Sequence, residues 1–308
     1  MTQLRPRLGI ALGSGSARGW AHIGVLRALE AAGIEPDIIC GTSIGALVGG
    51  AYAAGQLDAL EDWARSLSLL DVVGFMDVTL ARGGLIGGEK LFKGLRRFHS
   101  DVTIESMAKP FAAVATDFGS GREIWLQKGS LLDAVRASTS LPGIFPPVKV
   151  GGQWLVDGGL VNPVPVSVCR ALSAEVVIAV NLNGDLTSRN VPSRATQREA
   201  RTEPRKDRLS ARLKFRGAGG FLAAQLLEPK QKTPGFFEVL AGALYIMQDR
   251  ITRSRMAGDP PDVVLAPRLA QIRLLEFHRA DEAIDAGRAS VAPMLTEVQR
   301  ALTLRDER

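Results

Sequence analysis

The chain has 308 residues, of which 46% are hydrophobic and 23% charged, with a formal net charge of +6. This apolar share fills the core of one large α/β domain or two small ones, while no apolar run approaches the roughly 18 residues of a membrane-spanning helix. The N-terminal apolar run is also too short for a secretory signal. Cys40 and Cys169 both fall in expected core elements, so we expect buried, unpaired thiols and a cytoplasmic location.

A glycine- and serine-rich loop at residues 13–19 follows the first predicted strand, the apolar run 8–12. Apolar residues then recur at helical spacing over 20–29, with Gly33 as a C-terminal stop. A glycine-rich turn that enters a helix offers backbone N–H groups to an anion. Two guests suit such a loop: a phosphate, or the oxyanion of an acyl transfer.

The residues of this loop disfavour the phosphate. A dinucleotide-binding loop needs glycine where Arg18 stands, and an acidic residue at the end of the second strand. Asp37 precedes that strand instead, and the Lys-Ser/Thr of a Walker loop is missing after Gly19. The oxyanion is favoured because a candidate nucleophile lies one helix later.

Residues 41–45 read Gly-Thr-Ser-Ile-Gly, which fits the pattern Gly-x-Ser-x-Gly. The short apolar run 37–40 before them predicts a buried strand, and the small residues of 46–54 predict a closely packed helix. A serine presented on a sharp strand-to-helix turn needs glycine on either side. The pattern therefore indicates Ser43 as a nucleophile flanked by Gly41 and Gly45, and the alternative is an ordinary strand–turn–helix connection.

A second apolar run ends at Asp157 and is followed by Gly158 and Gly159. A carboxylate at a strand end could reach a serine presented from another strand. By itself, however, the segment is better read as a simple Asp-Gly turn.

The rest of the chain alternates strand and helix signals. Strands are predicted at 111–116, 123–126, 175–180 and 263–266. Helices are predicted over most of 56–102 with a break at 82–88, after a capping box that begins at Ser130, and at 221–227 and 236–247. One further C-terminal helix is predicted to continue through Pro293. This alternation predicts an α/β fold with a mostly parallel sheet covered by helices on both faces. We expect one catalytic domain over residues 1–308, with a basic insertion at 186–235.

The positive charge is concentrated in residues 186–217, which hold ten Lys and Arg against three acidic residues. This segment's net charge of +7 exceeds that of the whole chain. A solvated insertion is the simplest interpretation, and a contact for anionic phospholipid headgroups is the alternative. Nucleic-acid binding is not predicted, because interleaved aromatic residues and a recognised module are missing.

Taken in order, the loop 13–19, the Gly-x-Ser-x-Gly turn and Asp-Gly-Gly resemble the patatin-like phospholipase family. Residues 137–147 and 160–165 extend the resemblance, which covers about residues 7 to 182 and is strongest to short bacterial single-domain members. The resemblance implies a Ser–Asp hydrolase fold that cleaves phospholipids or other fatty-acyl esters without a metal or organic cofactor.

The resemblance also implies roles for individual residues. Ser43 matches the nucleophile and Asp157 its partner in a dyad without histidine. The commoner family loop has glycines where this chain has Ser14 and Ser16. The residues that match the oxyanion hole are Gly13, Ser14, Gly15, Ser16, Ala17, Arg18 and Gly19, and the motif glycines are Gly41, Gly45, Gly158 and Gly159.

Three histidines test the dyad. Only His278 follows Asp157, as the usual order of a Ser–Asp–His triad requires, and it lacks a glycine-bearing loop to present it. His22 is expected to pack or cap, and His99 to be solvated. Two alternatives remain open: a soluble-ester hydrolase or thioesterase with the same dyad, and a lipid- or nucleotide-binding module without catalysis.

Overall fold

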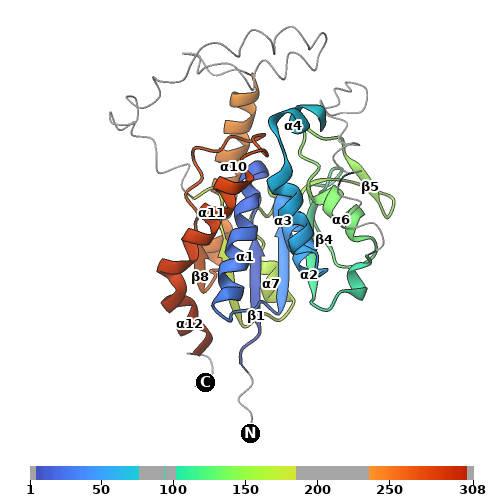
Figure 1. Ribbon diagram of the computed structural model, residues 1–308. Coiled ribbons are helices and arrows are strands. Elements are labelled where there is room, and N and C mark those ends of the chain that lie inside the picture. The colour runs from blue at the N-terminus through green and yellow to red at the C-terminus, as the bar shows by residue number, and fades with distance from the viewer. Residues whose placement is uncertain (1–4, 76–93, 95–101, 185–235, 304–308) are drawn as a thin grey trace, which may run out of the picture.

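The structure is a computed structural model, and it describes residues 5–75, 94, 102–184 and 236–303. The basic insertion, the break at 82–88, the helix expected at 221–227 and His99 lie outside these residues. The described residues contain an eight-stranded sheet in the order β5-β6-β3-β2-β1-β7-β8, with β4 also paired to β3 (Figure 1). The strands are β1 Leu8–Leu12, β2 Ile38–Thr42, β3 Phe111–Asp117, β4 Glu123–Leu126, β5 Val148–Val150, β6 Gln153–Asp157, β7 Val176–Val180 and β8 Val263–Leu265.

Five neighbouring strands, β3, β2, β1, β7 and β8, are parallel, whereas β4, β5 and β6 run antiparallel to their partners. Alternate residues of β1 face opposite sides, so Leu8, Ile10 and Leu12 enter one core and Ala11 enters another. All five residues of β1 are buried. Continuous burial of this kind is what a parallel sheet covered on both faces requires.

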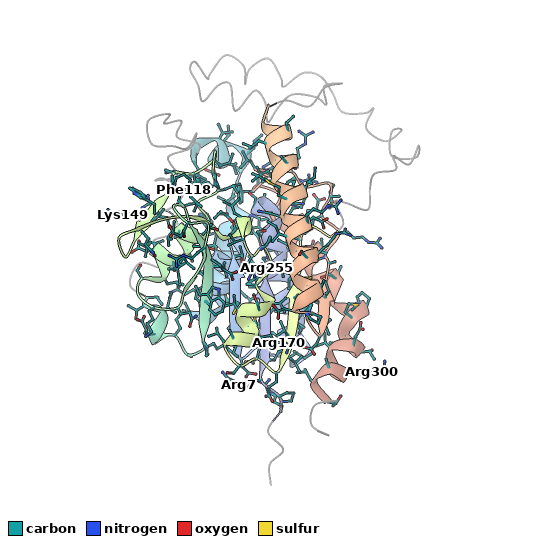
Figure 2. The ribbon with its side chains drawn as sticks, turned by 180° about the vertical axis from the view of Figure 1, so that it is seen from behind. Arg7, Phe118, Lys149, Arg170, Arg255 and Arg300 are labelled. Carbon is teal, nitrogen blue, oxygen red and sulfur yellow. The ribbon has the colours of Figure 1, made fainter. Side chains whose placement is uncertain are left out.

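Helices cover both faces of the sheet and confirm the predicted fold class. Figure 1 shows α1 (Ala21–Ala31) and α3 (Leu57–Ser66) in front of the strands, and Figure 2, seen from behind, shows α7 (Val166–Ala171) and α10 (Phe236–Gly258) on the other side. The front core also takes residues from α2 (Ile44–Ala53), α6 (Leu131–Ser138) and α11 (Ala280–Val291). Cys40 and Cys169 are both buried and free, as predicted.

Some helix boundaries differ from those predicted. The single C-terminal helix is wrong: α11 ends at Val291, a short 3-10 helix (η6, Ala292–Met294) follows, and α12 (Leu295–Thr303) completes the segment. Pro293 lacks the N–H that a continuous α-helix needs. The predicted helix start at Ser130 is confirmed, because the Ser130 hydroxyl accepts from the Asp133 N–H and caps α6. Strand β5 and helix α7 were not predicted.

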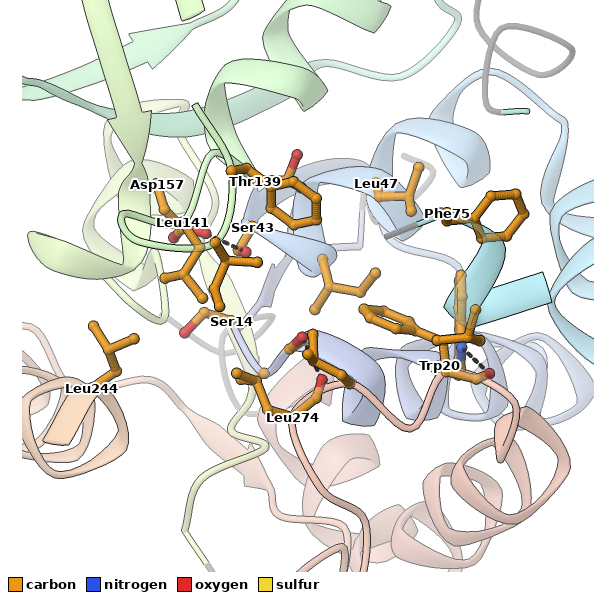
Figure 3. A pocket seen from close by; sticks show the side chains of 18 of the residues that line it. Ser14, Trp20, Ser43, Leu47, Phe75, Thr139, Leu141, Asp157, Leu244 and Leu274 are labelled. Atoms are coloured by element: carbon orange, nitrogen blue, oxygen red, sulfur yellow. Dashed lines mark hydrogen bonds between the residues drawn. The ribbon is translucent and has the colours of Figure 1, made fainter. Parts of the chain in front are cut away.

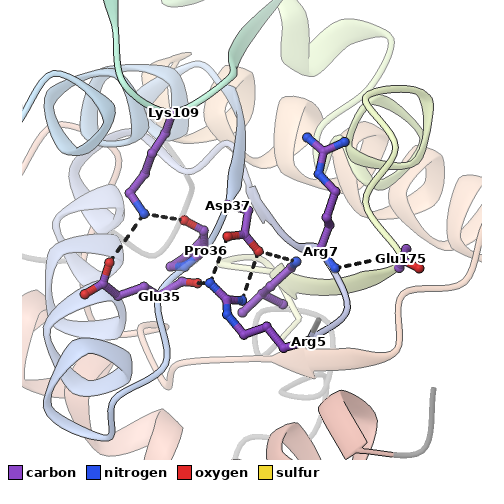
Figure 4. Close-up of polar contacts among 8 residues, drawn as sticks. Arg5, Arg7, Glu35, Pro36, Asp37, Lys109 and Glu175 are labelled. Carbon is purple, nitrogen blue, oxygen red and sulfur yellow. Dashed lines mark hydrogen bonds and ion pairs between the residues drawn. The ribbon is translucent and has the colours of Figure 1, made fainter. Parts of the chain in front are cut away.

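Asp37 lies at the opposite edge of the sheet from the loop 13–19. Its carboxylate accepts from the Leu8 N–H at 2.8 Å and from the Arg5 guanidinium, at the amino end of β1 (Figure 4). The glycine-rich loop leaves the other end of β1, the carboxyl end. Asp37 therefore has a structural role, which is to hold the start of β1 in place. Among the described residues, no helix has the length and apolar character needed to span a membrane.

Candidate active site

Ser43 occupies a sharp turn between β2 and α2, with φ 57° and ψ −125°. This backbone conformation is costly for a residue with a side chain. The flanking glycines make the turn sterically feasible, since a Cβ at Gly45 would lie 2.1 Å from the Leu12 carbonyl oxygen and one at Gly41 would lie 2.3 Å from the Gly45 oxygen. The two glycines therefore allow the turn that presents Ser43, and Ser43 lines a pocket next to this turn.

Asp157 ends β6, and its carboxylate accepts two hydrogen bonds. The Ser43 hydroxyl donates to Oδ2 at 2.5 Å (Figure 3), and the Gly159 N–H donates to Oδ1 at 2.7 Å. The second bond holds the carboxylate in place from the turn that follows the strand. The structure thus brings together the serine and the aspartate that the motifs single out.

Burial changes the acidity of Asp157. The residue is only 1% exposed, and this burial raises its pKa to about 6, against the lowering effect of the hydrogen bonds from Ser43 and Gly159. A carboxylate with this pKa is still ionised at pH 7, yet it is a stronger base than an ordinary solvated aspartate.

Most amides of the predicted oxyanion loop are already paired. The Gly13 N–H donates to the Val180 carbonyl, Ser14 to Pro163, and Ala17 to Leu274, while the Arg18 N–H turns back to Gly15. Residues 16–20 form a short 3-10 helix (η1, Ser16–Trp20), so the predicted loop is partly helical. Fewer amides of this loop can therefore bind an anion than the seven predicted residues would supply.

Three amides beside Ser43 remain available. The N–H groups of Gly15, Ser16 and Ile44 donate to no group in the described part of the chain, and all three residues line the pocket. Ile44 was not predicted, although it follows the nucleophile candidate, the position that commonly supplies an oxyanion donor on such turns.

The two histidines in the described part of the chain, His22 and His278, do not enter this arrangement. His22 is fully buried on α1, and its Nε2 lies 2.7 Å from the Gly13 carbonyl oxygen. Burial lowers its pKa to about 4, so the ring is neutral at pH 7 and supports the loop by donating to Gly13. His278 lines no part of the pocket, although its neighbour Phe277 does.

Hydrogen bonds to neighbouring segments of the chain hold the turn at Ser43 in place. The Ser43 N–H donates to the Ser138 hydroxyl at 2.9 Å, and that hydroxyl donates to the Val114 carbonyl at 2.6 Å. The Thr42 hydroxyl donates to the Asn162 carbonyl at 2.8 Å. Ser138 and Asn162 lie in segments that carried the family resemblance, but the sequence did not indicate what they contact.

Helix α10 contacts the site although it lies far from Ser43 in the sequence. Its Gln248 accepts from the Ser14 hydroxyl at 3.1 Å, and its Tyr245 ring packs 4.0 Å from the guanidinium carbon of the buried Arg18. Leu244 of the same helix also lines the pocket. No short motif marks these residues, because they reach the site only through the packing of α10 on the sheet.

The pocket beside Ser43 is lined mainly by apolar side chains. They come from η1, α2, α3, α4 (Leu69–Phe75), the segment after α6, α10 and the segment before α11. The apolar lining residues are Trp20, Ile44, Leu47, Trp63, Leu67, Val72, Phe75, Leu141, Ile144, Phe145, Leu244, Leu274, Leu275 and Phe277. Such a lining suits an alkyl chain. Within the described residues, no three His, Cys, Asp or Glu side chains gather as a metal site would require.

Comparison with known proteins shows the family of this chain. Residues 10–170 match the patatin-like phospholipase family. The chain belongs to that family. An uncharacterized NTE family protein of Mycobacterium tuberculosis is 34% identical to this patatin-like chain, over 98% of this chain and 94% of its own length.

One further relative and one solved structure are less similar to the chain. Patatin-like phospholipase domain-containing protein 6 of Mus musculus is 30% identical over 91% of this patatin-like chain, which spans only 20% of that longer protein. The crystal structure of VipD from Legionella pneumophila matches with a TM-score of 0.44 and 12% identity, covering 95% of this chain and 67% of VipD.

Proposed function

We propose that this protein is a serine lipid acyl hydrolase that cleaves carboxylic esters of fatty acids through a Ser43–Asp157 dyad. Membership of the patatin-like phospholipase family supports a lipid ester as the substrate. The observation that carries the proposal is the 2.5 Å hydrogen bond from Ser43 to the buried Asp157 at the side of an apolar pocket.

In the first half-reaction, the Ser43 oxygen attacks the ester carbonyl carbon while its proton passes to Asp157. The carbonyl oxygen becomes an oxyanion, and we assign its stabilisation to the amides of Gly15, Ser16 and Ile44, which line the pocket beside Ser43. When the tetrahedral intermediate collapses, the bond to the alcohol breaks and the leaving oxygen takes the proton from Asp157. The acyl group then remains on Ser43.

In the second half-reaction, Asp157 accepts a proton from water as that water attacks the acyl-serine carbonyl. A second tetrahedral intermediate forms at the same amides. Its collapse breaks the bond to Ser43, which recovers its proton from Asp157, and the fatty acid is released. No proton needs a histidine in this cycle.

Two assays test the proposal. Wild type should hydrolyse phospholipid vesicles and react with a fluorophosphonate probe, whereas Ser43→Ala should do neither. Turnover of soluble short-chain esters or thioesters without turnover of vesicles would instead favour the soluble-ester hydrolase or thioesterase. A folded wild type that neither reacts with the probe nor turns over any ester would indicate a lipid-binding module.

The basic segment 186–217 supports a further part of this proposal, contact with an anionic membrane surface. Its net charge of +7 would attract acidic headgroups. Replacing Arg201, Arg205 and Arg208 by Glu should weaken binding to anionic vesicles at low salt, and the difference should shrink as salt rises. Equal binding of both proteins at low salt would leave the segment as a solvated insertion.

A further inference from the structure

The pocket is chemically divided around Ser43. Its polar side chains gather at one end, where Ser43 bonds to Asp157 and Ser14 bonds to Gln248. From Ser43 the lining continues along Leu47 toward α3 and α4, and Figure 3 shows Leu47, Trp20 and Phe75 on the side away from Asp157. We call this apolar side, lined by Trp20, Leu47, Trp63, Leu67, Val72 and Phe75, the aromatic arm.

Four aromatic rings in contact with one another lie along the far side of the aromatic arm. The Trp20 ring lies 6.0 Å from Trp63, at an interplanar angle of 84°, and 6.0 Å from Phe277. The Trp63 ring lies 6.4 Å from Phe75. The two contacts of Trp20 are edge-to-face, a favourable arrangement for aromatic rings, and the tilted Trp63–Phe75 contact extends the row to α4.

The Trp20 ring of this row is held firmly. Trp20 is 1% exposed, and its indole N–H donates to the Phe277 carbonyl at 3.1 Å. Rotating this ring would break that bond and open a void in the core, which packed interiors resist. The half-buried Trp63 of α3 contacts Trp20, and the half-buried Phe75 of α4 contacts Trp63.

An alkyl chain that enters this arm from Ser43 therefore runs toward rings that pack on the fixed Trp20 side chain. Each methylene that enters the arm leaves water, which favours binding, until the chain reaches the rings and further length is excluded. We propose that the aromatic arm binds the acyl chain of the ester and that Trp63 and Phe75 set the longest chain it accepts. This inference rests on the proposed function, and it assigns the side chains that select among fatty-acyl substrates.

The test is a chain-length profile. The ratio kcat/KM is measured for soluble 4-nitrophenyl esters of graded acyl length. Trp63→Ala and Phe75→Ala should each move the preferred length upward, with the ratio of long-chain to short-chain turnover rising about tenfold or more. Leu70→Ala is the matched control, because Leu70 lies on the same helix as Phe75 but is 72% exposed and outside the pocket lining. Its profile should equal that of wild type.

A second measurement separates this inference from the proposed function. Free fatty acids of graded length are titrated calorimetrically into wild type and Trp63→Ala, which requires no turnover. Longer acids should gain affinity for the variant relative to wild type. If both variants fold cooperatively and react with the fluorophosphonate probe but keep the wild-type profile, the inference is overturned while the hydrolase proposal stands. If no ester is turned over and no probe reacts, the hydrolase proposal fails, and an unchanged fatty-acid preference would overturn the arm as well.

Discussion

The Ser43 hydroxyl donates to the Asp157 carboxylate at 2.5 Å, although 114 positions separate the two residues in the chain. Strand β3 brings them together: its Val114 pairs with Thr42 of β2, and its Ala115 pairs with Asp157 of β6. Ser43 follows Thr42 directly. The bond is thus a consequence of sheet register, and a shift of β6 by one residue would turn the carboxylate to the opposite face.

The first prediction concerns this pair. Ser43→Ala and Asp157→Asn should each lower kcat on a soluble ester by about a thousandfold or more, because the serine cannot act without its base. The double variant should be no worse than either single one, since residues that act as a unit are not additive. Additive losses, or substantial turnover by a folded Ser43→Ala protein, would contradict the dyad.

The second prediction concerns the pH dependence of the rate. Asp157 must be ionised to accept the proton, and its pKa is raised to about 6. We expect kcat/KM to rise with pH, with a midpoint near 6, and to level off above it. The profile is measured on a soluble ester to avoid effects on vesicles. A midpoint near the ordinary aspartate value of about 4 would show that burial does not tune this group.

The third prediction concerns stability. The raised pKa means that the folded state binds the Asp157 proton more tightly than the unfolded state. The associated stabilisation is present below the unfolded pKa near 4 and is lost as pH rises through 6. Two pKa units correspond to about 3 kcal/mol at most. Asn cannot ionise and therefore does not lose this stabilisation. The free energy of unfolding of Asp157→Asn, minus that of wild type, should therefore rise by up to about 3 kcal/mol between pH 4 and pH 8.

Urea unfolding of both proteins at the two pH values measures this difference. Comparing the two proteins at each pH cancels the titration of every other group. A constant difference would mean that the ionised carboxylate is not destabilised by its surroundings.

The fourth prediction concerns the oxyanion loop. A Cβ at Gly15 would lie 2.6 Å from Leu182 Cδ1 and 3.0 Å from Leu182 Cβ, so in Gly15→Ala either Leu182 or the loop that carries the amides of Gly15 and Ser16 must shift, and we expect the loop to shift. These amides act on the developing oxyanion, and kcat should fall about tenfold to a hundredfold with little change in KM. Gly242→Ala on α10 is the control, because a Cβ there meets no atom within 4 Å. A folded Gly15→Ala protein with wild-type kcat would remove Gly15 from the site.

The fifth prediction concerns His278. This residue lines no part of the pocket, so His278→Ala should keep most of the wild-type kcat and the same pH midpoint. Were the variant folded but as inactive as Ser43→Ala, a triad would replace the dyad.

Much of this protein follows from its sequence alone, because the relevant signals are local. Apolar runs identified the parallel strands, and glycines on both sides of Ser43 identified the turn, since only glycine tolerates the close backbone approach at Gly41 and Gly45. The same signals led to the patatin-like phospholipase family, which the match over residues 10–170 confirms. The catalytic roles of Ser43 and Asp157 are the part that the predictions above test.

Other features depend on contacts between distant segments, and only the tertiary structure decided them. The pKa of Asp157 depends on how completely the fold buries it, and the choice of Gly15, Ser16 and Ile44 as available amides depends on which neighbours are already paired. Gln248 reaches Ser14 from 234 positions away. The aromatic arm joins rings from η1, α3 and α4 in the same manner. No local pattern carries this information, because burial and pairing are properties of the packed chain.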